Sequence, residues 1–297
     1  MKLKIILSLA LTASVFLSCG NDKAKESNMP EMVEEKAAFD YNVEQFADIK
    51  ILRYQIPGWE NLTLKEQKLV YYLVQAGLVG RDIMWDQNYR HNLKIRNALE
   101  HVYTNYEGDK TTDNWNAFET YLKRVWFSNG IHHHYSNDKL KPAFSSDYLK
   151  ELLVETNTIL EGEAFDVIFN YADSKKVNQA KGVDNVALSA VNFYGPNVTN
   201  ADVERFYKAK QSPNPEKPLS FGLNSKLVKE NGVLKELVYK SGGLYGDAID
   251  EIIKWLELAK SVAENDAQGN ALGLLIEYYK TGDLQTWDDY NVAWTAD

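Results

Sequence analysis

Apolar residues recur at spacings of three and four over most of the chain after residue 39, and this period predicts a helix-rich domain. The clearest helix start is Thr63, which forms a capping box with Glu66 just before a periodic apolar stretch. A second start of the same kind lies at Thr199, with Asp202 three residues later. Further helices are expected at residues 93–102, 115–127, 146–160, 249–262 and 271–279.

Strand signals are confined to two stretches. Val186–Tyr194 is rich in β-branched and aromatic residues and ends at a Gly-Pro-Asn turn, which predicts a strand. Residues 225–239 flank Asn231-Gly232, the pair that favours a type I′ turn, so a β-hairpin is expected there. The predicted fold class is therefore α+β, predominantly α-helical with a small β portion.

The first 38 residues have the pattern of an export signal followed by a linker. Two lysines precede the apolar run Ile5–Leu17, which is too short to span a bilayer. Leu17-Ser18-Cys19 resembles a bacterial lipobox, so we expect residues 1–18 to be a signal peptide and Cys19 to be lipidated. An ordinary signal with an incidental cysteine is the alternative. Residues 19–38 are polar and predict a tether that holds the domain, residues 39–297, near a membrane.

This organisation predicts an exported protein that is lipid-anchored to a bacterial membrane, on its periplasmic or cell-surface side. The lipid is the only membrane contact that the sequence predicts, because no later stretch approaches 18 apolar residues.

Composition narrows the classes of function. The 297 residues include 33 Lys and Arg against 42 Asp and Glu, a formal net charge of −9, and an acidic chain without a basic cluster is a poor nucleic-acid binder. The single cysteine excludes an intrachain disulfide and a zinc site with two or more cysteines. The sequence also lacks a G-x-S-x-G nucleophile motif. The residues by themselves thus contain no complete catalytic set.

Three adjacent histidines, His132, His133 and His134, are the most conspicuous candidates for chemistry. Imidazole is a common zinc ligand, yet on a strand neighbouring side chains point to opposite faces, and no H-E-x-x-H motif supplies further ligands. A plain polar loop and a substrate-contacting loop remain the other interpretations. Asp82 and Asp86, one helical turn apart, are expected to belong to an ion-pair network, and residues 240–246 to be a glycine-rich connection into a helix.

Five segments resemble dipeptidyl peptidase III, a zinc exopeptidase family, and most closely its bacterial lipoprotein-type members. They are Phe46–Leu73 (FADIKILRYQIPGWENLTLKEQKLVYYL), Gly80–Leu93 (GRDIMWDQNYRHNL), Tyr121–Ser136 (YLKRVWFSNGIHHHYS), Val191–Asp202 (VNFYGPNVTNAD) and Trp287–Asp297 (WDDYNVAWTAD). The resemblance extends in order from about residue 40 to the end of the chain.

The resemblance implies a two-lobed enzyme that releases dipeptides from the amino end of oligopeptides, with zinc held by a His-Glu-x-x-Gly-His helix in the second lobe. That motif is absent from this sequence. The chain is therefore expected to be the N-terminal, substrate-binding lobe, with no catalytic or metal-binding residue, no bound zinc and no activity by itself.

The same resemblance implies a site for short peptides. The loop after Gly130 resembles the family's loop at the subsite for the second substrate residue, with Tyr135 at the position of the family's aromatic residue. Asn129, His134 and Tyr135 are accordingly the expected peptide-binding residues. Two functions stay open: the first part of a zinc-dependent dipeptidyl peptidase, and a non-catalytic peptide-binding lipoprotein.

Overall fold

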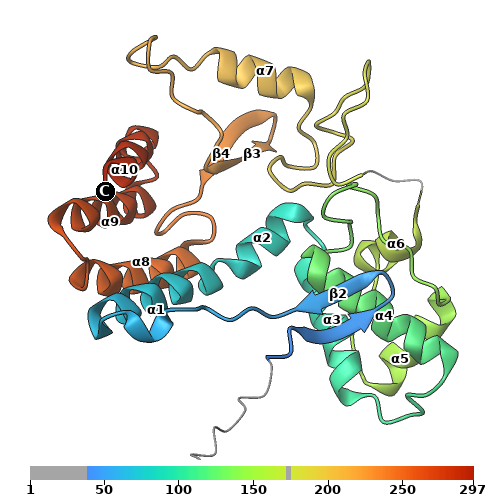
Figure 1. The fold of residues 1–297 in the computed structure, drawn as a ribbon. Coiled ribbons are helices and arrows are strands. Elements are labelled where there is room, and N and C mark those ends of the chain that lie inside the picture. The colour runs from blue at the N-terminus through green and yellow to red at the C-terminus, as the bar shows by residue number, and fades with distance from the viewer. Residues whose placement is uncertain (1–38, 172–174) are drawn as a thin grey trace, which may run out of the picture.

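The computed structural model describes residues 39–171 and 175–297, so the predicted signal peptide, Cys19 and tether lie outside the described residues (Figure 1). The strands are β1 (Asn42–Phe46), β2 (Ile49–Leu52), β3 (Ser225–Glu230) and β4 (Val233–Val238). The α-helices are α1 (Leu64–Val79), α2 (Arg81–Asn88), α3 (Asn92–Asn105), α4 (Asp113–Ser128), α5 (Ser146–Glu155), α6 (Glu163–Phe169), α7 (Asn200–Lys208), α8 (Gly246–Ser261), α9 (Asp266–Thr281) and α10 (Leu284–Ala296). A 3₁₀ helix, Trp59–Asn61, precedes α1. None of the helices in the described ranges is long and apolar enough to cross a bilayer.

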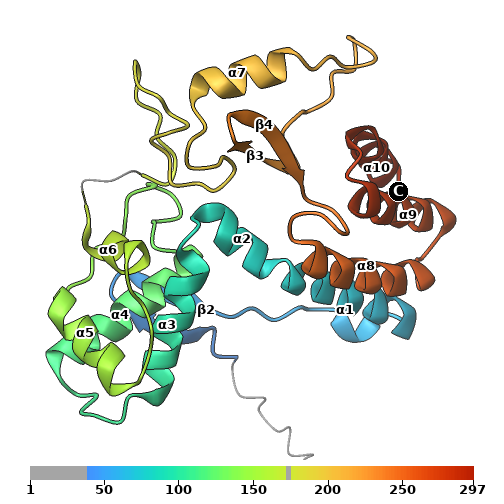
Figure 2. The ribbon, with the colours of Figure 1, turned by 180° about the vertical axis from the view of Figure 1, so that it is seen from behind.

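Most of these helices fall into two groups (Figure 2), and each group surrounds a hydrophobic core. The first lies among α3, α4, α5 and α6 and contains Trp115, which is 1% exposed and stacks on Tyr106 at a ring-centroid distance of 4.6 Å. The second lies among α1, α8 and α9, with Leu69 and Leu272 among its members. Helix α2 runs between the two groups, and α7 with the β3–β4 hairpin forms a third part beside them.

The predicted fold class is confirmed, and most local signals predicted the right elements. Thr63 and Glu66 form the expected capping box at the start of α1. The β3–β4 hairpin turns at Asn231 and Gly232, whose φ values of 50° and 80° are those that a type I′ turn requires. The helix expected at 146–160 ends early at Glu155, because Asn157 adopts a left-handed conformation with φ 50°.

The second predicted capping box connects α7 to the hairpin. Asp202, 3% exposed, accepts hydrogen bonds from the backbone and hydroxyl of Thr199 and forms ion pairs with Arg205 (2.7 Å) and Lys229 of β3 (2.8 Å). Lys229, above all, lowers the pKa of the Asp202 carboxyl to about 2. The carboxylate therefore stays charged at neutral pH and joins α7 to the sheet.

The strand predicted at Val186–Tyr194 is wrong. The segment consists of turns, and only Tyr194 forms an isolated bridge, with Leu227 of β3. Its backbone amides bond to carbonyls of other segments, as those of Ala190 and Val191 do to Lys175 and Lys176, or to side chains. The amide of Val186 donates to Asn200 Oδ1, and the amide of Ala187 donates to Asp184 Oδ1.

The β1–β2 hairpin was not predicted, because its turn contains Ala47 at φ 46° and no Asn-Gly signal. Tertiary contacts hold it instead. Glu44 and Asp48 form ion pairs with Lys123 and Arg124 of α4. Phe46 adds a ring contact with Phe127 at 5.8 Å. The hairpin is thereby fixed to the helix that leads into the candidate site.

Candidate functional site

The candidate site is the loop that follows α4 and leads to α5. Helix α4 ends at Ser128, and the cap residue Asn129, with φ 52°, is followed by Gly130 with φ 142°. The amide of Gly130 donates to the carbonyl of Val125 at 3.1 Å, and the amide of Asn129 to that of Trp126 at 3.2 Å. These bonds satisfy carbonyls that the helix end leaves open, and they turn the chain sharply out of the helix.

Asn92, the first residue of α3, holds the beginning of this loop. Its side chain is buried, its Nδ2 donates to the carbonyl of Trp85 at 3.0 Å, and its Oδ1 accepts the amide of Ile131 at 3.2 Å. Asn88 of α2 donates to the carbonyl of Asn129 at 3.0 Å. The loop therefore starts from a position that side chains of α2 and α3 fix.

Beyond this point the loop closes on itself as a narrow hairpin. The amide of Leu140 donates to the carbonyl of Ile131 at 2.8 Å, and the amide of His133 to that of Asp138 at 2.7 Å. Ile131 and Leu140 are both buried in the first core. Their burial anchors the base of the hairpin, and residues 134–137 form its tip.

The three adjacent histidines have different surroundings. His132 is 2% exposed and packs edge-on against Tyr89 at 5.4 Å. His133 Nδ1 accepts the amides of Tyr135 (3.2 Å) and Ser136 (3.1 Å), so this nitrogen carries no proton and the neutral ring is protonated on Nε2. In a strand, neighbouring side chains would point to opposite faces, but this alternation does not hold past His132. The chain turns at His133, and the ring of His133 stacks on that of His134 at a centroid distance of 4.6 Å.

The rings of His133, His134 and Tyr135, here called the ring stack, lie together at the tip of the loop, with the two histidines stacked and Tyr135 tilted against them. The ring of His134 lies 4.4 Å from that of Tyr135, and Tyr135 is 83% exposed. Two of the three predicted peptide-binding residues are thus brought together. A large exposed ring face of this kind offers a stacking surface for apolar or aromatic side chains.

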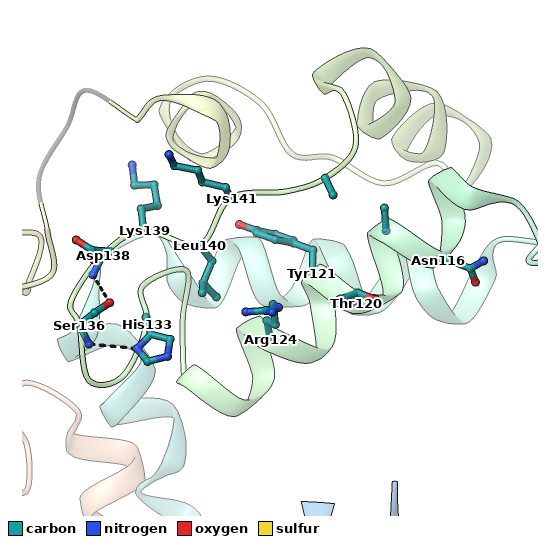
Figure 3. A pocket seen from close by; sticks show the side chains of 12 residues that line it. Asn116, Thr120, Tyr121, Arg124, His133, Ser136, Asp138, Lys139, Leu140 and Lys141 are labelled. Atoms are coloured by element: carbon teal, nitrogen blue, oxygen red, sulfur yellow. Dashed lines mark hydrogen bonds between the residues drawn. The ribbon is translucent and has the colours of Figure 1, made fainter. Parts of the chain in front are cut away.

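A pocket of about 670 Å³ lies between α4 and this loop (Figure 3). Its lining residues are Asn116, Ala117, Thr120, Tyr121, Arg124, His133, Ser136, Asp138, Lys139, Leu140, Lys141 and Ala143. His133 is the member of the ring stack that lines it. In Figure 3 the His133 ring accepts a hydrogen bond from the backbone amide of Ser136. The hydroxyl oxygen of Ser136 in turn accepts one from the amide of Asp138 at 3.2 Å.

Most charged groups in the pocket wall already have partners within the chain. Arg124 pairs with Asp48, Lys139 Nζ donates to a backbone carbonyl, and Asp138 pairs with Lys175 at 3.0 Å. The pairing with Lys175 lowers the pKa of the Asp138 carboxyl. Burial raises the pKa of Tyr121, so its hydroxyl stays protonated. Such a wall suits a polar, uncharged group, for example a peptide backbone, better than a free ion.

Asn129, the third predicted residue, lies elsewhere. It lines a separate cavity between α1, α2, α8 and α9, and no contact in the described ranges joins it to His134 or Tyr135. Conversely, His133 was a candidate for chemistry but was not among the expected peptide-binding residues, although it shapes the turn and lines the pocket. The role of His133 in the turn is shown by its Nδ1, which accepts hydrogen bonds from the amides of Tyr135 and Ser136. These bonds exist only in the folded loop, so the sequence does not reveal them.

The described residues do not fit zinc. No group of three or more His, Cys, Asp or Glu in residues 39–171 and 175–297 is placed to hold a metal ion. His132 is buried against Tyr89, and Nδ1 of His133 is taken by backbone amides. We therefore derive no chemistry through a metal at this loop.

The remaining motifs serve the fold. Asp82 pairs with Arg96 at 2.7 Å, as expected. Asp86 instead accepts hydrogen bonds from the hydroxyl of Tyr245 (2.6 Å) and the side-chain Nδ2 of Asn192 (3.0 Å). Tyr245 occupies the N-cap position of α8 and Gly246 is the first residue of that helix, which confirms residues 240–246 as a connection into a helix.

Comparison with known proteins agrees with this architecture. The fold is similar to that of part of dipeptidyl peptidase III. The structure of the protein from Caldithrix abyssi matches with a TM-score of 0.50 and 18% identity, over 80% of this chain and 34% of that one. Dipeptidyl peptidase III from Corallococcus sp. strain EGB matches with a TM-score of 0.49 and 17% identity, over 81% and 34% of the two chains. No protein-family model and no curated protein matches the sequence.

This chain therefore spans about a third of the length of the two structures. At such low identity the likeness concerns the fold alone. It agrees with the architecture that the resembling segments imply, and it assigns no activity to this chain.

Proposed function

We propose that the chain is the N-terminal, substrate-binding lobe of a dipeptidyl-peptidase-III-type protein, and that the loop after α4 binds short peptides. The observation that carries the proposal is the exposed ring stack of His133, His134 and Tyr135 beside a pocket with an amphipathic wall. The similarity of fold to about a third of dipeptidyl peptidase III supports it.

In this proposal the loop binds and orients a peptide but does not cleave it. A side chain of the peptide stacks on Tyr135, and peptide amides lie against the pocket wall, where most charged groups already have partners within the chain. Cleavage belongs to a polypeptide that also carries the His-Glu-x-x-Gly-His motif, where zinc would supply the activated water. The motif is absent from the 297 residues. For the chain by itself, peptide binding without cleavage is the function that the site supports.

Replacing Tyr135 by alanine tests the peptide site. If the ring contacts the peptide, its loss removes apolar contact worth about 1–3 kcal/mol, which is on the order of tenfold in Kd. Fluorescence anisotropy with a labelled hexapeptide that has a bulky second residue measures the change. Tyr135→Phe should bind nearly as well as the native chain, because the ring and not the hydroxyl makes the contact.

Tyr54→Ala is the matched control. Tyr54 is 75% exposed and lies in the segment between β2 and the 3₁₀ helix, so its removal should leave peptide binding unchanged. Equal Kd values for the native chain and Tyr135→Ala would refute the peptide site at this loop. An equal loss in Tyr54→Ala would show that the peptide binds the surface without a site.

The lipobox leads to a proposal about location, namely that Cys19 carries a lipid that anchors the exported chain to a bacterial membrane. Cys19→Ala is expected to release the chain into the soluble fraction, because the tether is polar and offers no other membrane-seeking surface. Membrane fractionation at high salt, with immunodetection, measures this. A variant that still sediments with membranes would contradict the proposal.

A further inference from the structure

Helix α1 has the sequence of a buried helix but is only half covered. From Leu69 to Val79 its one strongly polar side chain is that of Gln75. A helix that is apolar nearly all round is normally surrounded by protein. Only one face, with Leu69 and Ala76, packs into the second core.

The opposite face of α1 is an exposed apolar stripe. Val70, Val74 and Leu78 follow each other at four-residue spacing, so they lie on one side of the helix. Their side chains are 39%, 51% and 55% exposed. Single exposed apolar residues are ordinary, but a row along one helix marks a contact surface.

A groove adjoins this stripe. A cavity of about 510 Å³ lies among α1, α2, α8 and α9, and its lining is mostly apolar. Leu78 belongs to both the stripe and the groove, and Met84 of α2 continues the apolar surface at 51% exposure. The charged group in the lining is Arg81. The surface therefore suits an apolar segment of protein better than a charged ligand.

A glycine in the middle of α1 gives an independent observation. Gly77 lies one turn before Arg81 and lines the groove, and a β-carbon built on it meets nothing within 4 Å. Glycine inside a helix costs stability relative to alanine, and no contact among residues 39–171 and 175–297 explains it. A small residue on an exposed helix face lets a second backbone approach closely. Gly77 therefore marks the place where a partner segment would cross α1.

We propose that this surface, comprising the stripe on α1 and the groove beside it, is covered by the portion of a dipeptidyl-peptidase-III-type protein that this chain does not span. The inference rests on the proposed function only for the kind of protein. The chain corresponds to 34% of the similar structure, so the larger part of such a fold must pack against surfaces of this third. The proposal holds whether that part is joined to this chain or separate from it.

Site-specific photocross-linking in the native host tests the proposal. A benzophenone side chain replaces Val74 on the stripe, and in the control it replaces Val154 of α5, which is 80% exposed and far from the groove in the fold. Mass spectrometry identifies the joined peptides. We expect position 74, but not position 154, to join sequences of dipeptidyl peptidase III type that lie outside these 297 residues.

Every other outcome overturns the proposal. Cross-links only to a second copy of this chain would show a homodimer, and cross-links to unrelated proteins would show another partner. Absence of any product from position 74 in well-folded protein would show a bare surface. Peptide binding by the loop is measured separately, so failure there leaves this result standing, and the reverse also holds.

Two substitutions at Gly77 sharpen the test. Gly77→Ala should raise the thermal midpoint of the purified chain by about 2 °C, because alanine favours the helix and its methyl group meets open space. Gly77→Leu should leave the chain folded and lower the cross-link yield from position 74 at least about fivefold, because its side chain occupies the crossing point. An unchanged yield in Gly77→Leu would contradict a close approach at this residue.

Discussion

Gly130→Ala is expected to destabilise the protein by about 4 kcal/mol and to disorder the loop that carries the ring stack. Two causes add. Gly130 has φ 142°, a conformation that residues with a side chain rarely adopt, and a β-carbon there would lie 2.2 Å from Asn92 Nδ2. Because Asn92 is buried, it cannot move aside without losing its own hydrogen bonds. Chemical denaturation measures the free energy of unfolding, and peptide binding should weaken in parallel.

Gly182→Ala separates the two causes. Gly182 also has a positive φ, 76°, but a β-carbon there meets nothing within 4 Å. Its substitution should therefore cost only the backbone strain, about 1–2 kcal/mol. If Gly130→Ala costs no more than Gly182→Ala, the clash with Asn92 is not real and the account of the loop is wrong.

Asn92→Ala is the second change with a large expected effect, about 3 kcal/mol. It removes the acceptor of the Ile131 amide and the donor to the carbonyl of Trp85, in a place that water does not reach. Buried backbone groups that lose their partners retain the full cost of desolvation. Denaturant unfolding of the variant measures this loss.

Asn97→Ala is the matched control, because Asn97 lies on the same helix with its side chain exposed. Its substitution should change the free energy of unfolding by less than about 0.5 kcal/mol. A small effect of Asn92→Ala, comparable with that of Asn97→Ala, would show that the loop does not depend on this side chain.

Gly130→Ala and Asn92→Ala should both affect peptide binding indirectly, by disordering the loop. Asn92 and Gly130 lie at the base of the hairpin, whereas His134 and Tyr135 lie at its tip. Neither residue at the base is placed against a peptide. Their variants should therefore weaken binding in proportion to the fraction of loop that is disordered, while Tyr135→Ala should weaken it without loss of stability. Measuring stability and Kd for the same variants distinguishes the two kinds of effect.

The elements that sequence reasoning predicted correctly depend on contacts between near neighbours. The capping boxes at Thr63 and Thr199 join residues three apart, and the Asn231-Gly232 turn is fixed by the φ values of two adjacent residues. The errors concern segments where distant partners decide. Val186–Tyr194 has the composition of a strand, but the amides of Ala190 and Asn192 donate to the carbonyls of Lys175 and Gln87, in segments far along the chain. The β1–β2 hairpin has a weak turn and is held by α4.

The residues of the candidate site were likewise predicted only in part. The resemblance in the sequence selected His134 and Tyr135, which lie together at the tip of the loop, and also Asn129, which lines a different cavity. His133 was not selected, although its ring accepts two amides and lines the pocket. Adjacent histidines cannot be ranked from spacing alone, because His132 is buried against Tyr89, far along the chain, and the bonds of His133 to the next amides form only in the folded loop.

Residues a few positions apart specify the helical character, the helix starts at Thr63 and Thr199, the β3–β4 hairpin and the apolar nature of α1, so these features can be predicted from the pattern alone. Contacts in the folded chain set which face of α1 is left uncovered, which histidine enters the core and how Asn92 fixes the loop. Those outcomes depend on which segments meet in space. A pattern with a period of two to four residues carries no information about such long-range contacts.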